Sequence, residues 1–415
     1  MQRLIVHNVG PIKVADIGLK KVNVFIGPQS SGKSTIAKII SFCTWLEKNK
    51  HEMGETYLFS NKVIDKMVGY HRMEGYLSEE SRIFYQGDNI AFAYNWPDKP
   101  DEEAIPLDFP DEGNDVYPTN YSEKEKFFFR KERTANPKVM YIPAERNFVS
   151  VVPNLKKYDD SKDSLQGFVM DWYEAKRSYD KAHALDIISL DMKYFAENDE
   201  DYIQMADGKS IRLRNASSGL QSVTPLVAVA NYMTQGIYEK ERPFSVEEQD
   251  VLNKVLRSLA DDSLSKNDAS EMKRRLLGFM QGKVYSHTQF IIEEPEQNIF
   301  PREQYKLMEH LIAIINHGKQ HRMTVTTHSP YIVNFLNVLL RRKENAASYI
   351  SHDDLNVFLI SDGELTDMML HNSDRTKWAV DTSVLSAAMD DIAEEFESKI
   401  HQSSLSHHAV LNGLP

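Results

Sequence analysis

The stretch 27–35 has the residue types and spacing of a phosphate-binding loop. It reads Gly-Pro-Gln-Ser-Ser-Gly-Lys-Ser-Thr, which fits the pattern G-x-x-x-x-G-K-S. In such a loop the backbone N–H groups surround a β-phosphate, the lysine reaches the β- and γ-phosphates, and the following hydroxyl binds Mg²⁺. The pattern therefore predicts that Lys33 binds phosphate and that Ser34 binds the metal. The other residues expected to line this site are Gly27, Gln29, Ser30, Ser31, Gly32 and Thr35.

Two carboxylates follow the apolar run 290–292. An acid at the end of a buried strand can hold Mg²⁺ directly or through water, and a second acid can polarise the water that attacks a γ-phosphate. We therefore expect Glu293 to be a metal ligand and Glu294 to be catalytic. The alternative is an acidic turn on the surface, which the apolar run before the two acids disfavours.

A histidine, His328, ends the run 322–327, which has the composition of a strand. A side chain at this place can hydrogen-bond a γ-phosphate or a leaving oxygen. A lone histidine is usually structural. The position of this one, after a strand and downstream of the two acids, favours a catalytic role.

A small polar segment, Ser217-Ser218-Gly219, precedes an expected helix over 223–233. Because the first N–H groups of a helix lack partners within it, such a segment can bind an anion. The same residues fit an ordinary helix cap, and taken alone the cap is the better interpretation.

Two further polar residues, Glu145 and Arg146, follow the expected strand 138–143. In an α/β fold, ligands bind where core strands end. Either side chain can sense a nucleotide or can belong to an ion pair at the surface, and both alternatives stay open.

The elements around the phosphate-binding loop are those that the motif requires. The strand Val22–Ile26 leads into the loop, and 36–40 has helical character. Residues 2–26 predict two strands joined by a turn. The expected fold class is α/β, a P-loop fold with a mixed central sheet, an N-terminal antiparallel β part and a helical insertion.

The segments between these motifs mainly predict secondary structure. A β-hairpin is expected over 81–96 and a second one around Asp362-Gly363. The basic segment 124–133 is expected to be a helix with its phenylalanines in the core, and a nucleic-acid or partner contact is the alternative. Residues 154–200 are expected to be mostly helical.

The composition limits the classes of protein that fit. The 415 residues carry 61 acidic and 49 basic side chains, a net charge of −12, which argues mildly against a DNA-coating protein. The single cysteine, Cys43, excludes internal disulfides and fits a reducing compartment. Without an evident signal peptide or a membrane-length apolar run, we expect a cytoplasmic protein with no membrane partner.

Taken in order, the motifs resemble those of ABC-type ATPases of the SMC, RecF and OLD branch. Residues 27–35 match the Walker A motif, 216–221 the ABC signature and 291–296 the Walker B motif in a Glu-Glu-Pro-Glu form. The resemblance places 296–298 at the D-loop and His328 at the switch histidine. No Q-loop glutamine is obvious, and the long coiled coil of SMC proteins and the nuclease domain of OLD proteins are not evident.

The resemblance implies a division of the chain. The ATPase core is 1–50, 138–150 and 205–370, with a β-hairpin and loop insertion at 51–137, a helical part leading to the signature at 151–204, a helical insertion at 234–283, and a C-terminal helix and tail at 371–415.

The resemblance also implies a mechanism. In this family two subunits sandwich two ATP molecules, so each site would use Lys33, Glu294 and His328 of one chain and 217–219 of the other. The implied cofactors are ATP and Mg²⁺, and the implied assembly is a homodimer or a higher homo-oligomer. ATP binding would close the dimer, and hydrolysis would release it.

The resulting hypothesis is an ATP-hydrolysing switch that controls a separate effector, a nuclease or toxin, in bacterial antiphage defence, where compact ATPases of this design occur. Two alternatives differ in class. One is a DNA-repair or recombination ATPase that binds DNA. The other is an ATP-dependent scaffold with little turnover.

Overall fold

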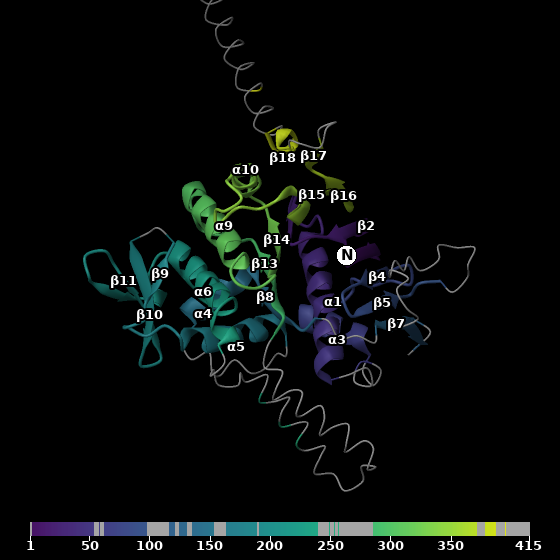
Figure 1. The fold of residues 1–415 in the computed structure, drawn as a ribbon, viewed down its shortest axis with the longest axis horizontal. Coiled ribbons are helices and arrows are strands. Elements are labelled where there is room, and N and C mark those ends of the chain that lie inside the picture. Colours follow the sequence, from purple (N-terminus) through teal and green to yellow (C-terminus); the bar gives the residue numbers. More distant parts are fainter. Residues whose placement is uncertain are drawn as a thin grey trace, which may run out of the picture.

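A computed structural model of the chain describes residues 2–53, 62–97, 116–120, 124–130, 135–152, 163–188, 191–239, 285–371 and 378–386, together with five single residues. Twelve strands of these residues form one mixed sheet (Figure 1). The sheet therefore runs through most of the described structure.

The parallel half of the sheet lies at the centre of the fold. Its strand order is β15, β3, β14, β13, β8, and each neighbouring pair runs parallel. The bounds are β3 Val22–Ile26, β8 Pro137–Ile142, β13 His287–Glu293, β14 Arg322–Thr327 and β15 Leu355–Ser361. Every residue of β3 and β13 is buried, as expected for strands covered on both faces.

The other half of the sheet is largely antiparallel. It contains β1 Gln2–Val9, β2 Ile12–Leu19, β4 Arg82–Gln86, β5 Ile90–Tyr94, β6 Val116–Asn120, β7 Glu125–Arg130 and β16 Glu364–Asp367. β16 pairs antiparallel with β15 of the parallel half, and a single parallel contact, between Glu364 of β16 and Val14 of β2, continues the sheet. The two halves are thus one continuous sheet.

Helices cover both faces of the sheet (Figure 1). On one face lie α1 Lys33–Met53 and α3 Val63–His71; on the other lie α5 Ser164–Lys176, α6 Ser218–Tyr232, α9 Pro301–Ile315 and α10 Pro330–Leu339. Side chains of β13 alternate between the two cores, because Phe290 and Ile292 pack with one set of helices and Ile291 with the other. The strands that carry the motifs are therefore fixed from both sides.

A second, four-stranded antiparallel sheet stands beside α6 (Figure 1). Its strands are β9 Leu185–Ile187, β10 Met192–Glu197, β11 Glu200–Gln204 and β12 Ser210–Arg212. The expectation that 154–200 is mostly helical is wrong from β9 onward. The strands of this sheet are short, and Tyr194 and Ile203 are fully buried on one side.

Three further expectations can be compared with the structure. Residues 2–26 form three strands, not two. The strand that was not expected, β2, intersperses its buried residues with exposed ones, so it has no continuous apolar run. The expected helix over 124–133 is wrong, since β7 is a strand, although its Phe127 and Phe129 are fully buried as expected. The hairpins at β4–β5 and β15–β16 are confirmed.

The expected fold class, a mixed α/β fold with an antiparallel N-terminal part, is confirmed. The expected insertion over 234–283 and the C-terminal helix and tail lie largely outside the described residues. Among the helices that the structure describes, none has the length and apolar character needed to span a bilayer.

Candidate active site

The predicted motifs meet at one edge of the parallel sheet. The phosphate-binding loop joins the end of β3 to the start of α1. Glu293 is the last residue of β13, Glu294 follows it, and His328 follows the end of β14. Because β3, β14 and β13 are parallel neighbours, their carboxyl ends lie side by side. Sequence spacing alone does not reveal this adjacency.

The phosphate-binding loop is held from outside by the β1–β2 turn. Gly32 has a φ of +108°, and a Cβ atom on it would lie 2.3 Å from Cδ1 of Ile12. Both the backbone angle and the close approach require glycine here. Pro28, Gln29 and Ser30 are exposed at the tip of the loop, whereas Thr35 is buried at the start of α1.

The ammonium group of Lys33 is turned back onto its own loop. It donates hydrogen bonds to the carbonyl oxygens of Gly27 at 2.9 Å and Pro28 at 2.7 Å. Burial lowers the pKa of Lys33, and the nearby carboxylates of Glu294, Glu296 and Glu293 oppose that shift. The lysine is thus a partly desolvated cation in an acidic environment.

The carboxylate of Glu293 lies beside Ser34, as the motif predicts for a metal site. It accepts hydrogen bonds from the Ser34 hydroxyl and, at 2.8 Å, from the hydroxyl of Tyr141. Burial raises the pKa of Glu293, while these two hydrogen bonds and the charge of Lys38 act to lower it. A bound dication would further favour the ionised form.

Glu294 and Lys33 are bridged by the imidazole of His328. Nδ1 lies 3.4 Å from Lys33 Nζ, and Nε2 lies 3.4 Å from Glu294 Oε1. Because an ammonium group can only donate, Nδ1 must accept and we assign the proton to Nε2, which faces the carboxylate. Both contacts are longer than the usual range of about 2.7–3.2 Å, as catalytic contacts often are before substrate binds.

Neighbouring side chains fix this arrangement. The backbone N–H of His328 donates to Oε1 of Glu296 at 2.6 Å, and Gln297 donates to Oε2 of Glu294 at 2.9 Å. The second oxygen of Glu296 is buried without a hydrogen-bond partner in the described structure. Tyr141 was not predicted as a site residue, since nothing in its local sequence separates it from an ordinary strand residue. Glu296 and Gln297 were expected only as part of the D-loop, without a contact to His328 or Glu294.

The structure excludes a surface ion pair for Arg146. Its guanidinium group is fully buried and contacts backbone carbonyl oxygens. It donates to the carbonyl oxygens of Ser222, Glu293 and Glu294. Burial lowers its pKa to about 10, so the group stays protonated near neutral pH.

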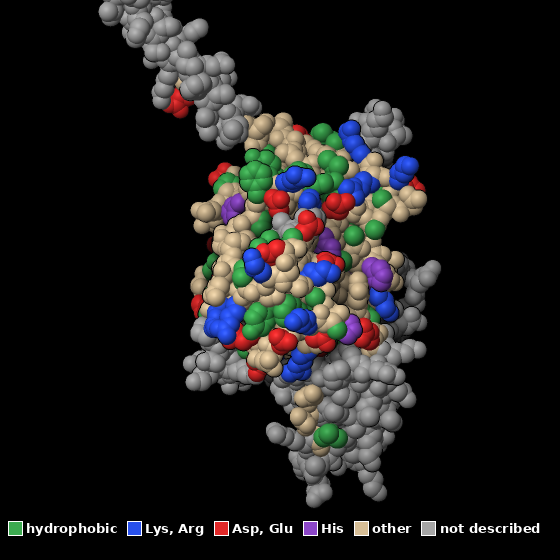
Figure 2. Space-filling view, turned by 90° about the vertical axis from the view of Figure 1, so that its left-hand side faces the viewer, with side chains coloured by type: hydrophobic (Ala, Val, Ile, Leu, Met, Phe, Trp, Pro, Cys, Tyr) green, Lys and Arg blue, Asp and Glu red, His purple; other side chains and the backbone are tan. Residues whose placement is uncertain are grey.

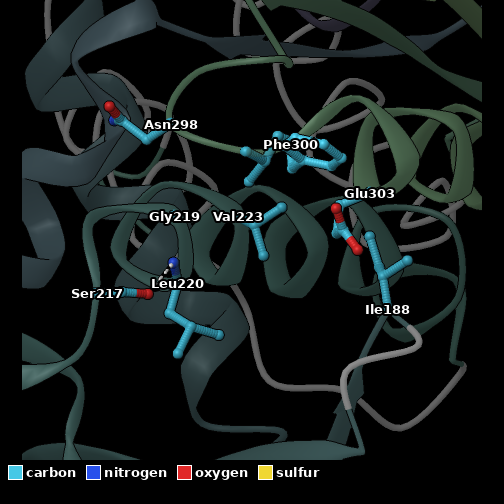
Figure 3. A pocket seen from close by; sticks show the side chains of 9 residues that line it. Ile188, Ser217, Gly219, Leu220, Val223, Asn298, Phe300 and Glu303 are labelled. Carbon is cyan, nitrogen blue, oxygen red and sulfur yellow. Dashed lines mark hydrogen bonds between the residues drawn. The ribbon is translucent and has the colours of Figure 1, made fainter.

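The predicted signature residues lie apart from the phosphate-binding loop of the same chain. Ser217 caps α6, its hydroxyl accepting from the backbone N–H of Leu220 at 3.5 Å, so the ordinary helix-cap interpretation is at least part of its role. Figure 3 shows Ser217 and Gly219 beside Asn298 and Phe300. These residues line a pocket of about 230 Å³.

The segment 296–298, which the resemblance places at the D-loop, packs against this helix. A Cβ on Gly219 would lie 2.7 Å from the carbonyl oxygen of Asn298, and the Asn298 side chain donates to Ser222 Oγ at 3.0 Å. Phe300 is 74% exposed at the rim of the pocket. The start of α6 therefore faces outward, where another molecule can reach it.

The residues present fit a nucleotide with a bound Mg²⁺. Ser31 Oγ, within the phosphate-binding loop, is buried and has no hydrogen-bond partner in the described structure. No group of three or more His, Cys, Asp or Glu side chains among the described residues can hold a metal by itself. The Ser34 hydroxyl and the Glu293 carboxylate suit Mg²⁺, which usually takes one or two protein oxygens and completes its shell with phosphate and water.

The described surface around the small sheet carries both acidic and basic side chains, with no large patch of one sign. Figure 2 shows basic and acidic side chains interspersed over the face that carries this sheet. Several of its ions are paired, including Lys193 with Asp186 and Lys209 with Asp207. This face therefore lacks the basic stripe typical of a DNA-binding surface.

No protein-family model and no curated protein matches this sequence. Among solved structures, the chain is similar to the SMC head domain from Thermotoga maritima, with 11% identity, a TM-score of 0.38, and coverage of 89% of this chain and 98% of that one. It is also similar to the Smc head domain from Pyrococcus furiosus bound to the C-terminal domain of ScpA, with 10% identity, a TM-score of 0.36, and coverage of 96% and 100%.

A third similar structure is the recombination mediator protein RecF of the RecFOR pathway, with 12% identity, a TM-score of 0.29, and coverage of 88% of this chain and 97% of that one. At such identities and scores, these similarities do not assign roles to residues of this chain. The roles proposed below rest on the strand order and side-chain geometry of the present structure.

Proposed function

We propose that the chain is an ATP-binding and ATP-hydrolysing switch, two copies of which close around ATP. The observation that carries this proposal is the convergence of Lys33, Glu294 and His328 from three neighbouring strand ends. A phosphate-binding loop alone supports only nucleotide binding. A carboxylate and an imidazole beside its lysine add the groups needed to activate and orient water.

Each residue has a role in this proposal. Lys33 leaves the carbonyl oxygens of Gly27 and Pro28 to bind the β- and γ-phosphates. Glu294 orients the attacking water and accepts its proton, while the Nε2–H of His328, which faces the Glu294 carboxylate in the free protein, turns to donate to the γ-phosphate. Mg²⁺, held by Ser34 and Glu293, would neutralise phosphate charge.

The dimer is supported by the position of the signature segment. Ser217 and Gly219 lie beside Asn298 and Phe300 and, within the part of the chain that the structure describes, make no hydrogen bond to the phosphate-binding loop. Their helix start faces outward and can meet the nucleotide of a second copy. In our proposal a closed dimer acts on a separate effector, a nuclease or toxin in antiphage defence.

The test combines ATP turnover with oligomeric mass for the wild type, Lys33→Ala and Glu294→Gln. Exposed Lys209→Ala and Glu197→Gln serve as matched controls. We expect slow turnover by the wild type, loss of nucleotide binding by Lys33→Ala, and a stable ATP-bound dimer or larger assembly for Glu294→Gln. Unchanged hydrolysis by Glu294→Gln would reduce the proposal to nucleotide binding.

The effector is tested by affinity purification of Glu294→Gln with ATP from the native host. A protein retained with Glu294→Gln but not with Lys33→Ala supports a controlled partner. A partner retained equally by both variants contradicts control by ATP.

A further inference from the structure

The deepest charged side chain near the site is Arg146, which has no exposed surface. It follows β8 in the short 3-10 helix Ala144–Asn147. Burying a cation is costly unless its donors are satisfied. A buried arginine at the edge of a candidate active site therefore calls for a specific function.

The guanidinium group joins two separate parts of the site. Nη1 donates to the carbonyl oxygen of Glu293 and Nη2 to that of Glu294, each at 2.8 Å. On its other side, Nε donates to the carbonyl oxygen of Ser222 in α6 at 3.1 Å. The planar fork of arginine suits this set of acceptors, and the single ammonium group of lysine does not reproduce it.

Glu294 needs such support because its backbone is strained. Its φ is +44°, in the left-handed region, which a residue other than glycine rarely adopts. Its N–H donates to the carbonyl oxygen of Thr326 at 2.8 Å, and its own carbonyl accepts from Arg146. Both peptide groups that flank Glu294 are thus anchored, which fixes the direction of its side chain.

A second contact joins the same two parts. Asn298, four residues after Glu294, donates to Ser222 Oγ at 3.0 Å and approaches Gly219 closely. The segment 294–298 and the first turns of α6 are therefore connected at two places. One of these places is the buried arginine, and the other is a neutral hydrogen bond.

We propose that Arg146 is a positioning residue for ATP hydrolysis, which holds the strained backbone of Glu294 and ties it to the start of α6. The inference rests on the proposed function. Arg146 acts through Glu294 and does not contact the nucleotide. It links the catalytic carboxylate of one site to the helix start that meets the nucleotide of the other site, so that a displacement of α6 alters the aim of Glu294.

The principal variant is Arg146→Lys, which keeps the charge but loses the fork. Its matched control is Arg342→Lys, since Arg342 also binds several side chains, Tyr305 among them, away from the phosphate-binding loop. We expect Arg146→Lys to bind ATP within about threefold of the wild type and to lose about 30- to 100-fold in kcat, the effect of a small misplacement of a catalytic group. Arg342→Lys is expected to leave both quantities unchanged.

A double variant separates positioning from general damage. If Arg146 acts through Glu294, adding Arg146→Lys to Glu294→Gln produces no further loss of turnover. A further loss equal to that seen in the single variant would overturn the inference. So would a folded Arg146→Lys with kcat within threefold of the wild type.

If Arg146→Lys does not fold, Asn298→Ala tests the inference instead. It removes the second connection, which is a neutral hydrogen bond, and leaves the buried Arg146 in place. We expect a lower kcat with unchanged ATP affinity, and unchanged kcat overturns the inference. A wild type without turnover overturns the proposed function together with this inference. Normal wild-type turnover with an unaffected variant overturns the inference alone.

Discussion

Nε2 of His328 lies 3.4 Å from Oε1 of Glu294, at the ends of two neighbouring parallel strands. The same ring presents Nδ1 to the ammonium group of Lys33. The imidazole therefore connects the lysine of the phosphate-binding loop to the proposed catalytic base, and its neutral Nε2–H tautomer satisfies both neighbours.

Replacing His328 should reduce turnover much more than binding. We expect His328→Ala to lower kcat about 100-fold, the size of effect typical of a positioned catalytic group, with ATP affinity within threefold. Single-turnover hydrolysis and equilibrium binding measure the two quantities. The exposed His183, paired only locally with Asp180, provides the control variant His183→Ala. A parallel fall in affinity and kcat would instead make His328 a ground-state binding residue.

Removing the Tyr141 hydroxyl should weaken the metal site. Tyr141→Phe takes away one of the hydrogen bonds that lower the pKa of the buried Glu293, so that pKa rises further and the carboxylate becomes a poorer ligand. We expect the Mg²⁺ concentration for half-maximal turnover to increase about 10-fold, in the range seen for outer-sphere groups. Tyr202→Phe, in the small sheet, is the control. An unchanged Mg²⁺ requirement would argue against Glu293 as a ligand.

Adding one methyl group at Gly219 should disturb the contact between α6 and the D-loop. A Cβ there lies 2.7 Å from the carbonyl oxygen of Asn298, so the loop must move. We expect Gly219→Ala to destabilise the protein by about 1–3 kcal/mol and to reduce turnover. Gly69→Ala in α3, where a Cβ meets nothing within 4 Å, is the matched control. Equal melting temperatures and turnover for the two variants would contradict the close approach.

The buried Glu47 predicts a pH dependence of stability. Burial, with a smaller contribution from Asp88, raises its pKa to about 8. The folded state then binds more protons than the unfolded state between the ordinary carboxyl pKa, about 4.3, and 8. The contribution of Glu47 to the free energy of unfolding is therefore greatest below this window and falls as pH rises through it.

Glu47→Gln imitates the protonated side chain and removes this dependence. We expect the melting temperature of Glu47→Gln relative to that of the wild type to rise steadily from pH 5 to pH 8.5. Comparing the variant with the wild type at each pH cancels the titration of other groups, including the buried His71, His287 and His321. A difference that stays constant with pH would show that Glu47 is ionised in the folded protein.

The sequence predicted the chemical groups better than their surroundings. The phosphate-binding loop, the acid pair and His328 are contiguous motifs, each next to a recognisable strand, so their local structure follows from short-range pattern. The placement of β3, β14 and β13 side by side depends on strand order, which a single sequence does not specify.

The contacts that the sequence did not predict act over long range. Arg146 was singled out as a residue at a strand end, but it contacts Ser222 and Glu294, which are remote in sequence, and nothing near Arg146 indicates that its charge will be buried. The strand β7 was mistaken for a helix because its charged residues suggested a solvated face. In the structure it pairs with β5, and its Glu125 and Lys126 are buried. Such pairing overrides local preference.

In the proposed dimer, each nucleotide site is shared between two copies of the chain. Mixing two inactive variants tests this sharing most directly. Glu294→Gln lacks the catalytic carboxylate but keeps the signature segment, whereas Ser217→Arg keeps the carboxylate and blocks that segment. A mixed dimer contains one site with both parts intact. We expect the mixture to recover up to about a quarter of wild-type turnover, because half of the randomly mixed dimers carry one intact site of two.

The control is to confirm by differential tagging that the two variants exchange subunits. Recovery well above the sum of the separate activities supports the shared site. If the variants form mixed dimers and turnover stays at that sum, neither chain completes the site of the other. That result would contradict the shared site.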